Sequence, residues 1–155
     1  MKKLFIYCSL AVVLAGCSKK TSTAPEIEPV LPPVSYTIIE DFENTAGKAS
    51  YAVADLSMPT GTWNLDDALV GNLATDLKAG SKSIRLRTGK VTMNFDVAGL
   101  NTVYIKHGKF GSDANSTWQL LMSTDGGLTF TQIGADIVED NTALKLDTFK
   151  VTTSA

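Results

Sequence analysis

Alternation of apolar and polar side chains is the sequence feature that most restricts what this chain can fold into. In the segment 90–97, KVTMNFDV, the apolar residues Val91, Met93 and Phe95 recur at every second position. A period of two is typical of a strand with one buried face. Similar runs are rich in β-branched and aromatic residues. The segments that we expect to form strands are 35–42, 49–56, 83–88, 90–97, 101–110, 117–124, 128–137 and 146–153.

Short strands separated by glycine-containing turns predict an all-β fold. We expect an antiparallel β-sandwich with a jelly-roll-like strand order. Turn sequences such as Thr88-Gly89-Lys90 mark the expected ends of strands. The segment 64–78 contains helix-forming residues, but Gly71 interrupts it and its flanks favour strands. Irregular chain with short strands is therefore the prediction for that segment.

The N-terminal sequence predicts export and lipid attachment. Lys2 and Lys3 precede an apolar run over residues 4–14, which has the length of a signal-peptide core and is short for a membrane span. The LAGC sequence ending at Cys17 resembles the lipobox of bacterial lipoproteins. The resemblance implies that residues 1–16 are a signal peptide and that Cys17 carries the lipid anchor. An ordinary secretory signal is the alternative.

The residues after Cys17 suggest how the protein is held and where. Ser18 does not resemble an inner-membrane retention signal, so we expect the outer membrane, with the periplasmic side and the cell surface both left open. Residues 17–34 contain four prolines and are expected to form an extended tether behind the lipidated cysteine. Residues 35–155 remain for a single β-sandwich domain.

Composition excludes several kinds of site. The two cysteines are Cys8, inside the expected signal peptide, and Cys17, so the expected domain has no thiol for a disulfide, a nucleophile or a zinc site. Fourteen basic residues less Lys2 and Lys3 leave twelve against sixteen acidic ones, a mature net charge of −4. An acidic domain without a basic face is not expected to bind nucleic acid.

The segment 123–130, STDGGLTF, fits the Asp-box pattern that recurs in sialidases and other secreted β proteins. Its residues suit a rigid hairpin, because aspartate accepts hydrogen bonds from its own turn and glycine permits positive φ. Sialidases carry several copies and arginines that bind the sialate carboxylate, whereas this chain has one copy and two arginines. We predict a structural turn without chemistry, at Ser123, Asp125, Gly127 and Thr129.

Residues 38–153 are similar to a β-sandwich module of secreted proteins of Bacteroidetes-type bacteria. That module occurs as a stand-alone lipoprotein domain and beside extracellular nucleases and other hydrolases, and it is not itself a known catalyst. Such modules usually close with a further strand that carries an aspartate, whereas this chain stops at FKVTTSA. The domain is either truncated or closed by a shorter strand. The residues that carry the resemblance are Phe42, Glu43, Trp63, Ser83, Arg85, Gly108 and the Asp125-Gly126-Gly127 hairpin.

Calcium is the candidate cofactor. Calcium prefers hard oxygen ligands, and weak sites are filled outside the cell. Related jelly-roll modules often hold a structural calcium ion beside the first strand, which implies Glu40, Asp41 and Glu43 as ligands in this chain. The aspartate that a closing strand would add is missing. The other acidic groups are expected to be solvated at the surface: Asp66, Asp67, Asp136, Glu139 and Asp140.

His107 and the aromatic residues are the remaining candidates for a site. A Ser-His-Asp hydrolase would have to use His107, the only histidine, but a lone strand histidine predicts a structural or solvent-facing role. Exposed rings stack on sugars, and the candidates are Trp63, beside the PTGT loop sequence, and Tyr104. Trp118 alternates with Leu120 and is expected in the core.

These observations predict a membrane-anchored lipoprotein with a non-catalytic binding or accessory module. The expected ligand is a glycan or an envelope protein. One alternative is an enzyme, or an accessory fragment of a secreted hydrolase or nuclease. The other alternative is a purely structural envelope protein. A catalytic site predicts facing carboxylates, or His107 with partners, in a pocket, whereas a binding site predicts an exposed aromatic ring without such a pair.

Overall fold

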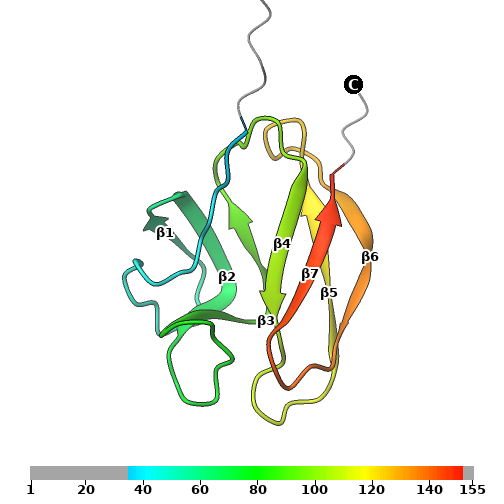
Figure 1. Ribbon diagram of the computed structural model, residues 1–155. Helices are drawn as coiled ribbons and strands as arrows, with labels where there is room; N and C mark the ends of the chain where they lie inside the picture. The colour runs from blue at the N-terminus through cyan, green and yellow to red at the C-terminus, as the bar shows by residue number, and fades with distance from the viewer. Residues whose placement is uncertain (1–34, 152–155) are drawn as a thin grey trace, which may run out of the picture. The chain divides into compact units, whose positions relative to one another are not determined.

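The computed structural model describes residues 35–151, and within them every regular element is a strand (Figure 1). The chain divides into Met1–Tyr36, of which two residues are described, and the compact unit Thr37–Ala155. The expected signal peptide and tether lie outside the described residues. The strands are β1 (Ala54–Met58), β2 (Gly61–Gly71), β3 (Ser83–Met93), β4 (Thr102–His107), β5 (Ser116–Met122), β6 (Thr131–Glu139) and β7 (Lys145–Lys150).

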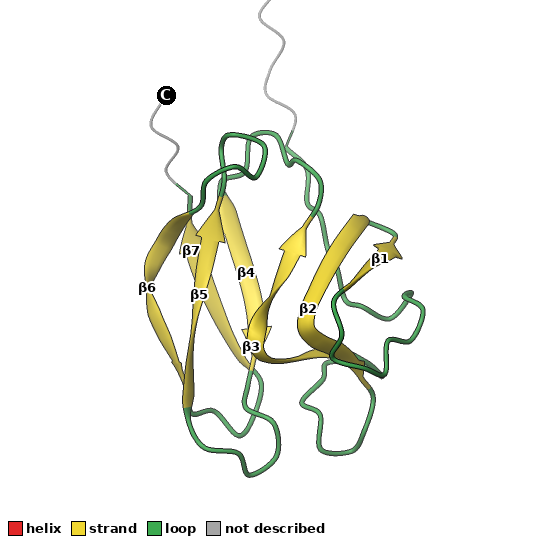
Figure 2. Cartoon of the chain, turned by 180° about the vertical axis from the view of Figure 1, so that it is seen from behind, coloured by secondary structure: helices red, strands yellow, loops and turns green. Residues whose placement is uncertain are grey.

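All strand pairings are antiparallel, so the predicted all-β, antiparallel class is confirmed for the described residues. β2 lies between β1 and β3 in a three-stranded sheet, and β4 pairs with β7 while β5 pairs with β6 (Figures 1 and 2). The jelly-roll-like strand order stays a prediction. Among the described residues, no helix has the length and apolar character that a membrane span requires.

The first core lies on one face of the three-stranded sheet. Leu65 is fully buried on β2, and its neighbours in the cluster come from β1 and β2, with half-buried side chains of β3 packed against them. Residues on β2 from position 68 to position 71 are all buried, so this strand is covered on both sides at that end. The buried cluster consists of Leu56, Met58, Leu65, Ala68 and Val70.

A bulge bends β2 between Asp66 and Ala68. Asp67 takes a positive φ of 48°, and β3 passes the bulge at Gly89. A Cβ at Gly89 would collide with the backbone of Asp66, which explains the need for glycine there. The sequence-based prediction of a turn at 88–90 is therefore wrong: β3 runs unbroken from Ser83 to Met93, so 83–88 and 90–97 are not separate strands.

Two other predictions for the first half of the chain are also wrong. Residues 35–42 form no strand; Ile39 is exposed, and Phe42 has a positive φ of 62° within a tight turn. Segment 49–56 is strand only from Ala54 onward. In 64–78, the prediction of no helix is confirmed, but β2 is one long strand and not a set of short ones.

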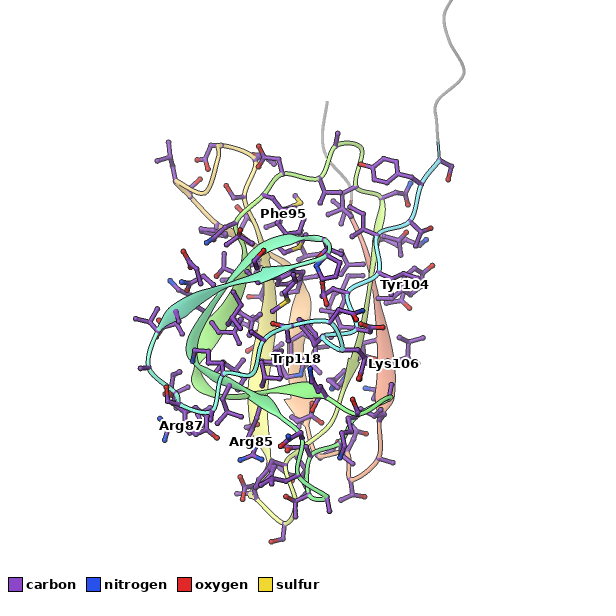
Figure 3. All side chains as sticks on the ribbon, turned by 90° about the vertical axis from the view of Figure 1, so that its left-hand side faces the viewer. Arg85, Arg87, Phe95, Tyr104, Lys106 and Trp118 are labelled. Atoms are coloured by element: carbon purple, nitrogen blue, oxygen red, sulfur yellow. The ribbon has the colours of Figure 1, made fainter. Side chains whose placement is uncertain are left out.

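A second layer of side chains joins the sheets β4–β7 and β5–β6. The ring of Trp118 on β5 lies 4.9 Å from His107 of β4 and 5.9 Å from Phe149 of β7, measured between centroids. Figure 3 shows Trp118 inside the fold, as its alternation predicted. Phe149 is 6% exposed and also approaches Gly134 of β6. The contacts of these rings hold two two-stranded sheets together as facing layers.

Candidate functional site

His107 lies between two carboxylates in this second layer. Its Nδ1 is 2.5 Å from Glu139 Oε2 on β6, and its Nε2 is 3.0 Å from Asp147 Oδ2 on β7. The side chains of His107 and Glu139 are 9% and 8% exposed. Lys145 Nζ lies 3.2 Å from Asp147. β4 and the two consecutive strands β6 and β7, more than twenty residues further along the chain, thus contribute one charged cluster.

Both carboxylate oxygens of Glu139 accept hydrogen bonds from neighbouring residues. Trp118 Nε1 donates to Glu139 Oε2 at 3.3 Å, and the backbone and side-chain nitrogens of Asn141 donate to Oε1. Burial raises the pKa of Glu139, but the hydrogen bonds from His107 and Asn141 outweigh it, so the pKa lies below its ordinary value. The expectation that Glu139 is solvated at the surface is wrong.

The chemistry of this cluster favours a structural ion pair. A catalytic base needs one ring nitrogen directed at a substrate, whereas both nitrogens of His107 face carboxylates. Only the doubly protonated ring donates to both partners. Burial raises the pKa of Asp147, but the hydrogen bonds from Lys145 and His107 lower it by more. The facing carboxylates that a catalytic site predicts are present, but each is occupied by His107.

Sequence reasoning did not find Glu139 and Asp147 as partners of His107. The sequence did contain an indication. His107 alternates in step with Val103 and Ile105, and Asp147 lies two positions before the buried Phe149, so both are at inward-facing positions of their strands. Ionisable residues at inward positions of alternating strands predict a buried charge cluster, because an isolated buried charge is costly. The pairing of β4 with β7 was needed to show that His107 and Asp147 meet.

Trp63 is the third residue of β2, just after the turn that joins β1 to β2. Its ring stands edge-on between Phe42, at 5.8 Å, and Phe95, at 5.9 Å. Its Nε1 donates to Thr60 Oγ1 at 3.0 Å, and that hydroxyl donates to Glu40 at 2.6 Å. Trp63 is half-buried and closes one side of the first core. Its role in ligand binding stays a prediction.

The three acidic residues expected to bind calcium have different protein partners. Glu40 accepts hydrogen bonds from the backbone of Phe42 and from Thr60, while Asp41 accepts one from the backbone of Glu43. Glu43 accepts from Ser81 and from the backbone of Lys82, and the hydrogen bond from Ser81 is the main cause of its lowered pKa. Within residues 35–151, no group of three or more acidic, histidine or cysteine side chains is arranged to hold a metal ion.

The calcium site stays a prediction, and thermal melting tests it. If calcium binds the native fold, millimolar calcium should raise the melting temperature relative to EDTA, because a ligand that binds only the native state stabilises it by mass action. Glu43→Gln is a poor control, since Glu43 fixes the 81–82 backbone. Asp41→Asn is the better variant for testing whether this carboxylate contributes to calcium stabilisation, because Asp41 accepts only a single local hydrogen bond. Identical melting in calcium and EDTA would contradict the prediction.

The 123–130 turn is held by its own side chains. Asp125 Oδ1 accepts from Ser123 Oγ and from the backbones of Leu128 and Thr129, while Oδ2 accepts from Thr129 Oγ1 at 2.6 Å. Ser123 Oγ accepts from the backbone of Gly127 at 2.8 Å. These bonds, led by that of Thr129, lower the pKa of Asp125 to about 2. Gly127 has a φ of 86°, a conformation that side chains other than glycine disfavour.

The outer face of the β4–β7 sheet carries an exposed aromatic ring between cations. Tyr104 is 63% exposed and pairs with Thr148, and Lys106 pairs with Leu146, which is 53% exposed. Lys150 donates to Thr102 Oγ1 at 3.0 Å at the other end of the same face. Tyr104 and Lys106 point away from the layer that contains Trp118 (Figure 3). We call this surface, with Thr102, Tyr104, Lys106, Leu146, Thr148 and Lys150, the outer β4–β7 face.

Both arginines of β3 are engaged by aspartate and by an aromatic ring. Arg85 makes two hydrogen bonds to Asp76, and its guanidinium lies 3.9 Å from the Phe110 ring centroid. Arg87 pairs with Asp67 and lies 3.7 Å from the ring of Tyr51. A depression of about 200 Å³ beside Arg85 is lined mainly by residues 69–73. The His107 cluster is not part of its lining.

The described residues therefore form an all-β unit in which His107, Glu139, Asp147 and the two arginines of β3 bond to other side chains of the same unit. Comparison with known proteins adds the N-terminal segment: residues 1–18 match the family model described as a prokaryotic membrane lipoprotein lipid attachment site. The match supports membrane attachment through Cys17, which lies outside the described residues. Neither the curated proteins nor the solved structures gave a match.

Proposed function

We propose that this protein is a lipid-anchored, non-catalytic module of the outer membrane that binds glycans through the outer β4–β7 face. The observation that carries the proposal is the exposed ring of Tyr104 on that face. Sugar rings present C–H groups that stack on aromatic faces. Trp63 is a weaker candidate, because Phe42 and Phe95 pack against it.

The neighbours of Tyr104 favour an acidic glycan. Lys106 follows Tyr104 by two residues on the same side of β4, and Lys150 lies on the paired strand. Lysine binds carboxylate, sulfate or phosphate groups as a point charge with three hydrogen-bond donors. Thr148, directly opposite Tyr104, adds a hydroxyl. The face thus combines a stacking ring, cations and a hydroxyl within two paired strands.

A glycan array probed with the mature chain carrying Cys17→Ser tests the proposal. We expect reproducible binding to acidic glycans and a loss of about tenfold or more for Tyr104→Ala. The reason is that an aromatic contact contributes about 0.5–1.5 kcal/mol beyond its buried area, and about 1.4 kcal/mol is tenfold in affinity. Lys106→Ala should weaken binding to acidic glycans selectively.

Leu121→Ala is the matched control, because Leu121 is an exposed apolar residue on the outer side of the other two-stranded sheet. It should leave binding unchanged. A folded protein that binds no glycan, or that binds equally well without Tyr104, contradicts the proposal. Co-purification from envelope extract would then distinguish an envelope-protein ligand from a purely structural role.

A further inference from the structure

The 123–130 turn presents apolar side chains that nothing in the described fold covers. Leu128 is 84% exposed and Phe130 is 51% exposed. Single exposed apolar residues are common on protein surfaces. These two differ because they lie together at the tip of a hairpin between β5 and β6 that is fixed by the side chains of Ser123 and Asp125. The tip is held by side-chain hydrogen bonds and exposes two large apolar side chains.

Four backbone N–H groups of the turn have side-chain acceptors within the turn itself. The backbone N–H groups of residues 125, 127, 128 and 129 all donate to the side chains of Ser123 or Asp125. Removing water from a backbone N–H group is costly unless the group already has an acceptor. These four N–H groups therefore lose little on leaving water, whereas the ionised carboxylate of Asp125 stays at the level of the lipid headgroups. The preformed conformation also reduces the entropy lost on contact.

The location of the turn relates it to the lipid anchor. Figures 1 and 2 both place the β5–β6 turn at the end of the Thr37–Ala155 unit where the described chain enters, and the β6–β7 loop at the opposite end. Cys17 precedes Thr37 by twenty residues, which span at most about 70 Å when extended. The anchor therefore limits how far the folded unit can move from lipid, which raises the effective concentration for a weak contact between them.

We propose that Leu128 and Phe130 form a second, apolar membrane contact that seats the folded unit on the phospholipid bilayer that holds Cys17. The two side chains insert at the boundary between lipid headgroups and acyl chains, where exposed apolar and aromatic side chains are buried. The contact is not electrostatic, because residues 123–132 contain neither lysine nor arginine. The outer β4–β7 face, which lies along the strands and not at this tip, stays accessible to a ligand.

Spin labelling of the lipidated full chain in vesicles tests the proposal. The mature sequence has no cysteine besides the lipidated Cys17, so Thr124→Cys gives one labelling site beside an intact tip. In phosphatidylcholine vesicles, we expect the label at 124 to be more accessible to oxygen than to a water-soluble nickel chelate. Thr142→Cys, in the exposed β6–β7 loop at the opposite end, should report bulk water.

The tip variant Leu128→Ser with Phe130→Ser supplies the decisive comparison. It should return the label at 124 to the water-like values of the label at 142, while the protein stays on the vesicles through Cys17. A label at 124 that is water-like beside the native tip overturns the proposal. Contact only with anionic lipid, or loss of contact in salt, indicates headgroup recognition and also overturns it. Spin–spin broadening at 124 would assign the tip to a second copy of the chain.

Membrane contact through the tip and glycan binding through the outer β4–β7 face can be tested independently of each other. The tip variant should keep the glycan binding of the native chain, and Tyr104→Ala should keep the membrane contact of the label at 124.

Discussion

His107→Ala is expected to lower the free energy of unfolding by about 3–5 kcal/mol, because it leaves the buried carboxylate of Glu139 without its histidine partner. Domains of this size are typically stable by about 5–15 kcal/mol, so the loss is a large part of the total. Urea denaturation followed by circular dichroism measures it. Lys106→Ala is the matched control, since Lys106 lies next to His107 but faces outward, and it should change stability by less than about 0.5 kcal/mol.

A double-mutant cycle separates the ion pair from the packing of the ring. His107→Ala with Glu139→Ala should cost less than the sum of the single changes, because the second change removes the unpaired charge that the first creates. Additive costs would show that the ring of His107 stabilises the protein only through contacts such as that with Trp118.

Acid should destabilise the protein through the same cluster. The pKa values of Glu139 and Asp147 lie below their ordinary values of about 4.3 and 3.9. The unfolded chain therefore takes up these protons first as the pH falls. The stabilisation is complete above the unfolded pKa values and is lost as the pH passes down through the folded ones. Stability curves of native protein and His107→Ala should converge as the pH falls through the lowered folded pKa values of Glu139 and Asp147, and parallel curves would contradict this account.

The second large effect is expected for Trp63→Ala. The substitution removes a ring that packs between Phe42 and Phe95 and should cost about 3–5 kcal/mol, as large-to-small changes at aromatic core positions do. It also removes the donor to Thr60, whose hydroxyl bonds to Glu40 and helps to fix the tight turn before β1. Thermal melting and urea denaturation measure the loss.

Trp63→Phe is the informative companion variant. It keeps an aromatic ring in the first core but deletes the indole N–H, so its smaller cost reports the hydrogen bond to Thr60 separately from packing. If Trp63→Ala leaves stability unchanged while abolishing glycan binding, then Trp63 is a ligand contact and the structural account of this residue is wrong. Binding assays with Trp63→Ala therefore need a folding control.

The second half of the fold could be predicted from sequence because its strands bury one face only. In 101–110, 117–124, 128–137 and 146–153 the alternation locates β4 to β7, with ends that differ by a few residues. β2 was not predicted as one strand because the bulge near Asp67 shifts its core positions from odd to even numbers, and its last residues are buried on both faces. Gly89 was predicted to lie in a turn. Sequence alone does not distinguish a glycine that makes room for a bulge in the neighbouring strand from one that reverses the chain.

The candidate site depends on which strands pair, and periodicity does not contain that information. The exposed ring of Tyr104 follows from alternation along β4, but its cationic neighbour Lys150 comes from a strand more than forty residues away. Likewise, the local pattern of 123–130 predicted a self-bonded turn, since all its partners are within four residues. Contacts such as that of His107 with Glu139 required the three-dimensional arrangement.

The separation of the two buried layers has a consequence for how the molecule opens. The first core is built from β1, β2 and β3, whereas the second joins β4 to β7 through Trp118, His107 and Phe149. The cation–π contact of Arg85 with Phe110 is one of the connections between them. Regions with their own buried clusters tend to exchange amide hydrogens as separate cooperative units. Amides of β2 and of β7 should therefore exchange through different openings, and His107→Ala should accelerate only the second.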